Sequence, residues 1–283
     1  MIIVLKGADF SANNIGKVDV SSVLSDRTKK IVARFSKNLS DYTQFALQEL
    51  IDWLDSEGIL SNMDALYLPC LAGTLEEAFV NVAKSPFNTD IVLDSEIFEL
   101  KSNGVRAKSS GVTNKGIQLT CTAPVKDMHL LWYNTEEYAK VLDIVYPVGG
   151  TNNFSFSPGE KDKEFTGGTP QCELGGYNIG TLSGGRMNNS GIVTAGKSLK
   201  GINHKDIDSL NGLKMYSPGM TMTKFNNEIN YASMTNSMGA FNISGVNNNA
   251  MLIPHGVFSL GRGLTDVQVI QYNEKINKLM TTL

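Results

Sequence analysis

The chain has 283 residues, of which 41% are hydrophobic and 19% charged, and its formal net charge is −3. This size and apolar content suffice for a sizeable core, whereas the slight negative charge offers no basic field for nucleic acid or an anionic membrane surface. We therefore expect no nucleic-acid partner. No run of 18 apolar residues occurs, so we also expect no membrane span.

The cysteines and histidines are sparse and widely spaced. Three cysteines in a chain of this length form neither a disulfide framework nor a metal-binding pattern, so each is expected to be a small core residue in a reducing compartment. No histidine has a second histidine at the spacing of a metal site. We therefore expect no metal and no cofactor. The residues concerned are Cys70, Cys121, Cys172, His129, His204 and His255.

Residues 1–24 are predicted to form an N-terminal arm. Residues 2–5 are typical of a short strand, and the polar stretch that follows has no periodicity of its own. Such a segment gains order from a partner or from the body of the protein. A strand added to a neighbour's sheet binds through main-chain hydrogen bonds. The apolar side chains of the arm, Ile3, Leu5, Phe10 and Ile15, are therefore candidate assembly contacts.

Residues 25–62 are predicted to form a helical hairpin. The first helix runs to about Asn38, and the second carries an apolar stripe at helical spacing and stops at Gly58. The candidate N-caps are Ser25 or Asp26 for the first helix and Ser40 or Asp41 for the second.

Large apolar side chains make the hairpin a candidate oligomer contact. Phe35 and Trp53, together with Phe45, are a large apolar set for two helices. Phe35 and Trp53 are therefore candidate assembly contacts. The alternative is that the set packs on the rest of the same chain.

Residues 63–283 are predicted to form a β-sandwich closed by a C-terminal helix. Short β-forming runs are separated by Gly, Asn and Pro turns, and no alternation of strands and helices suggests a parallel sheet. This pattern predicts a mainly β fold of the sandwich or jelly-roll kind. A short helix is expected at 74–82, and strands at 65–68, 91–93, 117–121, 130–133, 141–148, 154–156, 192–194, 214–216, 220–225, 241–243, 251–253 and 257–260.

The last helix has a clear beginning. Thr265 is its expected N-cap and Gln268, three residues on, completes a capping box. Leu264 and Val269 occupy the two positions of a hydrophobic staple. One face of this helix is apolar, so we expect it to dock on the sandwich or on the helix that contains Trp53.

One segment matches the pattern of a phosphate-binding loop. Residues 191–198 fit G-x-x-x-x-G-K-[ST], a loop that needs a buried strand before it and a helix after it. Polar residues precede the segment, and Gly201 disfavours a helix behind it. A strand that ends in a turn is therefore the expected structure, without phosphate binding.

No catalytic site is expected. Asp94 and Glu96 would share one face of a strand and resemble a glycosidase carboxylate pair, but solvent-facing charges are the simpler interpretation. The Gly/Asn-rich segment 149–212 contains Tyr177 and Arg186, which are candidate glycan contacts. The alternative is that this segment is a passive connection.

Three stretches carry a resemblance to a known class. Residues 4–16 resemble the N-terminal arm of virion proteins from tailed phages of Bacteroidetes hosts, including crAss-like phages. Leu66 to Pro69 and Phe258 to Asp266 resemble the concanavalin A-like (laminin-G-like) jelly roll of phage fibre and decoration proteins, in which the last strand leads into a closing helix. Glycosidases of that superfamily carry a Glu-x-Asp-x-x-Glu strand, which this sequence lacks.

The resemblance implies a non-catalytic structural component of a phage virion, a head or tail fibre or decoration subunit assembled in the bacterial host cytoplasm. Phage fibres and decorations are symmetric oligomers, so a homotrimer or dimer that contacts other virion proteins is expected. The alternative function is a lectin-like carbohydrate-binding module for attachment to a host-surface glycan.

Overall fold

The computed structural model describes residues 23–108, 117–124, 127–135, 143–147, 171–174, 177–181, 198–204, 213–216, 223–224, 237–245 and 254–283. The helices are α1 (Asp26–Val32), α2 (Asp41–Ser56) and α3 (Asp266–Met280), with short 3-10 turns η2 (Leu60–Asn62), η3 (Pro69–Leu71) and η4 (Glu76–Phe79). The strands are β1 (Met63–Tyr67), β2 (Phe98–Lys101), β3 (Gly104–Ala107), β4 (Ile117–Pro124), β5 (Met128–Asn134), β6 (Asp143–Pro147), β7 (Gln171–Leu174), β8 (Tyr177–Thr181), β9 (Ser198–His204), β10 (Leu213–Tyr216), β11 (Thr223–Lys224), β12 (Ser237–Gly245) and β13 (His255–Gly261).

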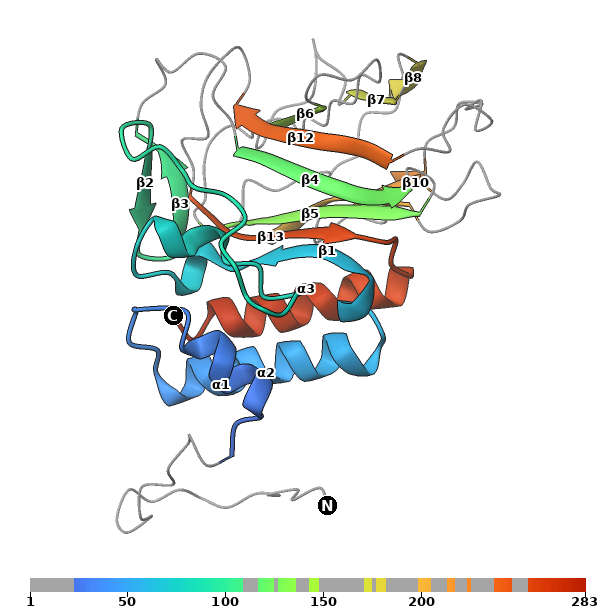
Figure 1. The fold of residues 1–283 in the computed structure, drawn as a ribbon. Helices are drawn as coiled ribbons and strands as arrows, with labels where there is room; N and C mark the ends of the chain where they lie inside the picture. Colours follow the sequence, from blue (N-terminus) through green and yellow to red (C-terminus); the bar gives the residue numbers. More distant parts are fainter. Residues whose placement is uncertain are drawn as a thin grey trace.

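The strands pair antiparallel, which confirms the mainly β class predicted from the sequence. Among the described residues, the largest sheet has the order β11-β10-β9-β5-β13-β3-β2, with β1 also paired to β13. A second sheet has the order β4-β12-β6, and β7 and β8 form a separate pair. Figure 1 shows β4 and β12 on the side of β5 that faces away from the helices.

Strand β13 occupies the centre of the large sheet, and all seven of its residues are buried. On one edge, Phe258 pairs with Trp132 of β5. On the other edge, the same residue pairs with Tyr67 of β1. The first residue, His255, pairs with Val105 of β3. The C-terminal strand therefore joins segments that lie far apart in the sequence.

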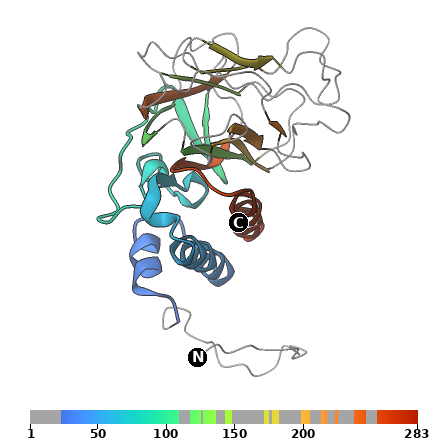
Figure 2. The ribbon, with the colours of Figure 1, turned by 90° about the vertical axis from the view of Figure 1, so that its right-hand side faces the viewer.

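Helices α2 and α3 lie side by side along β1, on one side of the sheet (Figures 1 and 2). The rings of Trp53 and Tyr272 stack at a centroid distance of 5.9 Å, and Thr43 donates from Oγ1 to the Thr282 carbonyl oxygen at 2.9 Å. One continuous apolar cluster includes Leu50 of α2, Leu66 of β1 and further residues of β5, β13 and α3. The helices are thus part of the same core as the sheet.

The predicted helix caps are confirmed. The side chains of Ser25 and Ser40 each accept a hydrogen bond from the backbone N–H three residues on. Thr265 and Gln268 form the predicted capping box of α3. Gly58 follows α2 with a φ of 66°, a left-handed conformation that favours glycine. No helix in the described part of the chain is long and apolar enough to cross a membrane.

Several local predictions were wrong. Helix α1 ends at Val32 rather than near Asn38, because the chain turns there and the Ser36 N–H donates to the Glu77 carboxylate. The helix expected at 74–82 is reduced to the 3-10 turn η4, after which Val80 forms a β-bridge with Thr89.

The strand expected at 91–93 is also absent, and five of the described strands were missed, namely β2, β3, β7, β8 and β9. Residues 91–94 form no regular element, because the Asp94 carbonyl oxygen accepts hydrogen bonds from the N–H groups of Ile97 and Phe98 and turns the chain. The hairpin of β2 and β3, whose two-residue turn is Ser102-Asn103, was not predicted.

The match to a phosphate-binding loop gains no structural support. Residues 191–197 lie outside the described residues, and Ser198 begins strand β9. A strand therefore follows the segment where a phosphate-binding loop requires a helix.

A buried polar network fixes the passage from β13 into α3. His129 on β5 lies with Nδ1 2.6 Å from the Arg262 carbonyl oxygen and with Nε2 2.7 Å from Ser259 Oγ. Because a carbonyl oxygen only accepts, Nδ1 donates to Arg262, and the second ring nitrogen shares a hydrogen bond with the Ser259 hydroxyl. Asp127 accepts hydrogen bonds from the Gly263 N–H and from Arg262 Nη1, each at 3.2 Å. These contacts hold the C-terminal connection against β5.

The close approach of β3 to β13 yields a test of this packing. A Cβ atom at Gly104 would lie 2.5 Å from the His255 carbonyl oxygen. Since neither backbone can yield freely, Gly104→Ala is expected to lower the free energy of unfolding by roughly 1–3 kcal/mol, measured by urea denaturation. Ser102→Ala, in the same turn and exposed, is the matched control and should change stability by less than about 0.5 kcal/mol. Equal stability of Gly104→Ala and wild type would contradict the packing.

Candidate functional site

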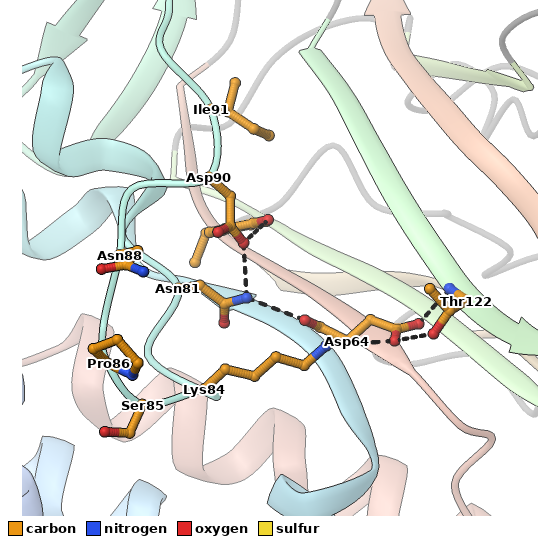
Figure 3. Close-up of a pocket in the computed structure, with 10 residues that line it drawn as sticks. Asp64, Asn81, Lys84, Ser85, Pro86, Asn88, Asp90, Ile91 and Thr122 are labelled. Carbon is orange, nitrogen blue, oxygen red and sulfur yellow. Dashed lines mark hydrogen bonds and ion pairs between the residues drawn. The ribbon is translucent and has the colours of Figure 1, made fainter.

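A polar pocket of about 570 Å³ lies where β1, β4 and the loop of residues 80–91 meet (Figure 3). Strand β1 contributes Asp64 and Tyr67, and β4 contributes Thr122. The loop contributes the rest of the lining, which is Asn81, Lys84, Ser85, Pro86, Asn88, Asp90 and Ile91. The pocket is thus assembled from three separate parts of the chain.

Asn81 fixes the loop against β1 and is only 3% exposed. Its Oδ1 accepts hydrogen bonds from the N–H groups of Leu66 and Ala83, at 3.3 and 3.1 Å. Its Nδ2 donates to the Asp64 carbonyl oxygen at 3.1 Å and to Asp90 Oδ2 at 2.8 Å. With two bonds accepted and two donated, the amide has one orientation and little freedom to move.

Asp64 ties β1 to β4. Its Oδ2 accepts from the N–H of Thr122 at 2.6 Å and of Ala123 at 3.1 Å, and its Oδ1 accepts from the Thr122 hydroxyl. Lys84 Nζ lies 3.7 Å from the same Oδ1. The Asp64 side chain is 12% exposed. This carboxylate is therefore occupied by contacts within the chain and joins the two main sheets.

Asp90 presents a carboxylate whose two oxygens differ. Oδ2 accepts from the Tyr67 hydroxyl at 2.9 Å and from Asn81 Nδ2. Oδ1 makes no hydrogen bond to any residue that the structure describes, and Asp90 is exposed. Oδ1 is thus able to accept a hydrogen bond from a ligand.

Tyr67 acts in the pocket as a neutral donor. Burial, followed by the charge of Asp90 and the hydrogen bond to it, raises the pKa of the Tyr67 phenol far above its usual value. The hydroxyl therefore stays protonated across the physiological pH range and holds Asp90 in place. A phenolate nucleophile is disfavoured at this position.

The remaining lining combines polar and apolar groups. The side chains of Ser85 and Asn88 are exposed and form no hydrogen bond with other described residues. Pro86 and Ile91 add apolar surface, and among the described lining residues Lys84 is the only cation, against the carboxylates of Asp64 and Asp90. Within the described ranges, no group of three His, Cys, Asp or Glu side chains is arranged to hold a metal ion.

The candidate residues from the sequence lie elsewhere. Phe35 is buried, and Trp53 is half-buried against Tyr272, so both contact other parts of this chain. Tyr177 begins β8 opposite Leu174 of β7, and its side chain lies outside the described residues. Arg186 lies wholly outside them, as do the arm residues Ile3, Leu5, Phe10 and Ile15.

Asp94 and Glu96 do not share a strand face. They lie in a turn in which Asp94 Oδ1 accepts from the Glu96 N–H at 2.9 Å, and both are exposed. Cys70 is a core thiol, as predicted, and its burial raises its pKa to about 12. The side chains of Cys121 and Cys172 lie outside the described residues.

Comparisons with known proteins give one distant structural likeness. No protein-family model matches the sequence, and no curated protein matches it. Among solved structures, the chain is similar to Trypanosoma rangeli sialidase with a TM-score of 0.41 and 9% identity. The match covers 84% of this chain and 38% of the sialidase chain, so the chain spans well under half the length of that protein.

This match corrects one prediction. The sequence predicts a chain without enzymatic function, whereas the matched protein is a sialidase, an enzyme. We therefore withdraw the statement that the chain is not an enzyme. A likeness at this TM-score and identity assigns no sialidase activity to it.

Asp64 offers a test of how the pocket is built. Asp64→Asn keeps one accepting oxygen for the N–H groups of Thr122 and Ala123 but removes the negative charge, so their charge-assisted bonds become neutral and the ion pair with Lys84 is lost. Because hydrogen bonds to a carboxylate are stronger than those to an amide oxygen, the free energy of unfolding should fall by roughly 1 kcal/mol in urea denaturation. Asp94→Asn is the control, because the remaining side-chain oxygen still accepts from the Glu96 N–H in an exposed turn. It should leave the free energy of unfolding nearly unchanged. An unchanged free energy of unfolding in Asp64→Asn would contradict the role of Asp64 in joining β1 to β4.

Proposed function

We propose that the chain is a structural subunit of a tailed-phage virion, a head or tail fibre or decoration component built on a concanavalin A-like jelly roll. The supporting observation concerns two stretches that resemble such proteins, Leu66 to Pro69 and Phe258 to Asp266. In the fold they run in neighbouring strands, with Leu66 opposite Ser259 and Tyr67 opposite Phe258. The second stretch leads directly into the capped helix α3, as the closing helix of that family does.

Assembly is proposed to use the N-terminal arm. The arm would add to the sheet of a neighbouring copy, through main-chain hydrogen bonds with the apolar side chains of Leu5 and Phe10 in surface pockets. A closed homotrimer or dimer is the proposed state, with other virion proteins as further partners and the virion as the location. Attachment to a host-surface glycan is the alternative function, and the polar pocket favours it.

The solution mass of the full-length protein tests assembly. Light scattering is expected to give two or three times the chain mass of 30.8 kDa. The double variant Leu5→Asp and Phe10→Asp should reduce the mass to that of one chain, because charged side chains are costly to bury in an apolar contact. The polar exchange Asn13→Asp in the same arm is the control and should leave the oligomer intact. A wild-type monomer would contradict self-assembly.

A further inference from the structure

The pocket of β1, β4 and the 80–91 loop holds hydrogen-bonding groups of two kinds. One kind is occupied: Asn81 and the Asp64 carboxylate bind their neighbours within the chain. The other kind belongs to exposed residues and has capacity left, namely Asp90 Oδ1, the Lys84 ammonium and the side chains of Ser85 and Asn88. The occupied groups hold β1, β4 and the 80–91 loop together at the rim of the pocket, and the second set is available to a ligand.

The rigidity of the rim favours binding. Asp90 is held by Tyr67 and Asn81, and the loop that contains it is tied to η4 and to itself by backbone hydrogen bonds, Asp90 N–H to Phe79 O at 3.1 Å and Asn81 N–H to Asn88 O at 2.8 Å. A preorganised site loses little conformational entropy when a ligand binds.

The charges of the lining select the ligand. Two carboxylates against one lysine disfavour an anion, and the absence of a three-carboxylate or histidine cluster among the described residues offers no cage for a metal cation. A neutral ligand that both donates and accepts hydrogen bonds fits acceptor and donor groups placed side by side. Pro86 and Ile91 supply apolar surface for the C–H faces of such a ligand.

We propose that this pocket binds a neutral, hydroxyl-rich ligand, a saccharide chain. Asp90 Oδ1 accepts from one or two sugar hydroxyls, and Lys84 and Asn88 donate to hydroxyl oxygens. A carboxylate that accepts from neutral hydroxyls gives stronger hydrogen bonds than an amide or hydroxyl would. The site is built from described residues of β1, β4 and the 80–91 loop, and it does not depend on the proposed virion role: the protein binds saccharide whether or not it self-assembles.

The test uses the full-length protein and an array of neutral oligosaccharides of glucose, galactose, mannose and N-acetylglucosamine, with sialyllactose as the acidic probe. Binding detected on the array is quantified by calorimetry. Asp90→Asn and Asn88→Ala are each expected to weaken binding of the neutral saccharide at least tenfold. Asp94→Asn, an exposed aspartate outside the pocket, is the matched control and should bind as the wild type does.

Folding of the variants is verified by thermal melting, and Asn88→Ala keeps the test decisive if Asp90→Asn unfolds, because the exposed Asn88 side chain supports no described contact. Three results would overturn the proposal: no neutral saccharide is bound, binding is unchanged in Asn88→Ala and Asp90→Asn, or sialyllactose is preferred. The oligomeric state, measured in the same samples, separates a failure here from a failure of the proposed virion function.

Discussion

The fold depends on the insertion of one C-terminal strand between two strands from earlier parts of the chain. β13 pairs with β1 on one edge and with β5 on the other, and its seven residues are all buried. Buried backbone groups must be paired, so neither β1 nor β5 can remain in place without it. The chain therefore reaches its native structure only when residues nearly 200 positions apart come together, a topology of high contact order.

Two further features follow from this insertion. The turn after β13 is clamped by His129 and Asp127, which directs α3 back along β1 and onto α2. The same β1 strand carries Asp64 and Tyr67, so the placement of β1 also sets two walls of the polar pocket. Core, helical layer and pocket thus share one strand, and damage to its pairing should affect all three.

The helix ends and several strands could be predicted from the sequence, because they depend on the preferences of residues close together in the chain. Ser40, Gly58 and Thr265 have the preferences of residues at helix ends, and runs of β-formers predicted strands such as β4, β5 and β13. The prediction of a strand at 91–93 was wrong because contacts in the folded chain override the local pattern. Val92 is exposed and Leu93 buried, an alternation typical of a strand, but the hydrogen bonds of Asp90 and Asp94 turn the chain instead.

The pocket was not predictable, because Asp64, Asn81, Asp90 and Thr122 are separated in the sequence and carry no motif. The one available signal was the polar, proline-containing run from Lys84 to Asp90, which is typical of a functional loop.

Hydrogen–deuterium exchange of the full-length protein across a denaturant series tests this account most directly. If β13 holds sheet and helices in one cooperative unit, amides of β1, β5, β13, α2 and α3 should lose protection together, at the free energy of global unfolding. Loss of protection in α2 and α3 at clearly lower denaturant than in β13 would contradict the account, because the helices would then be a separately unfolding layer.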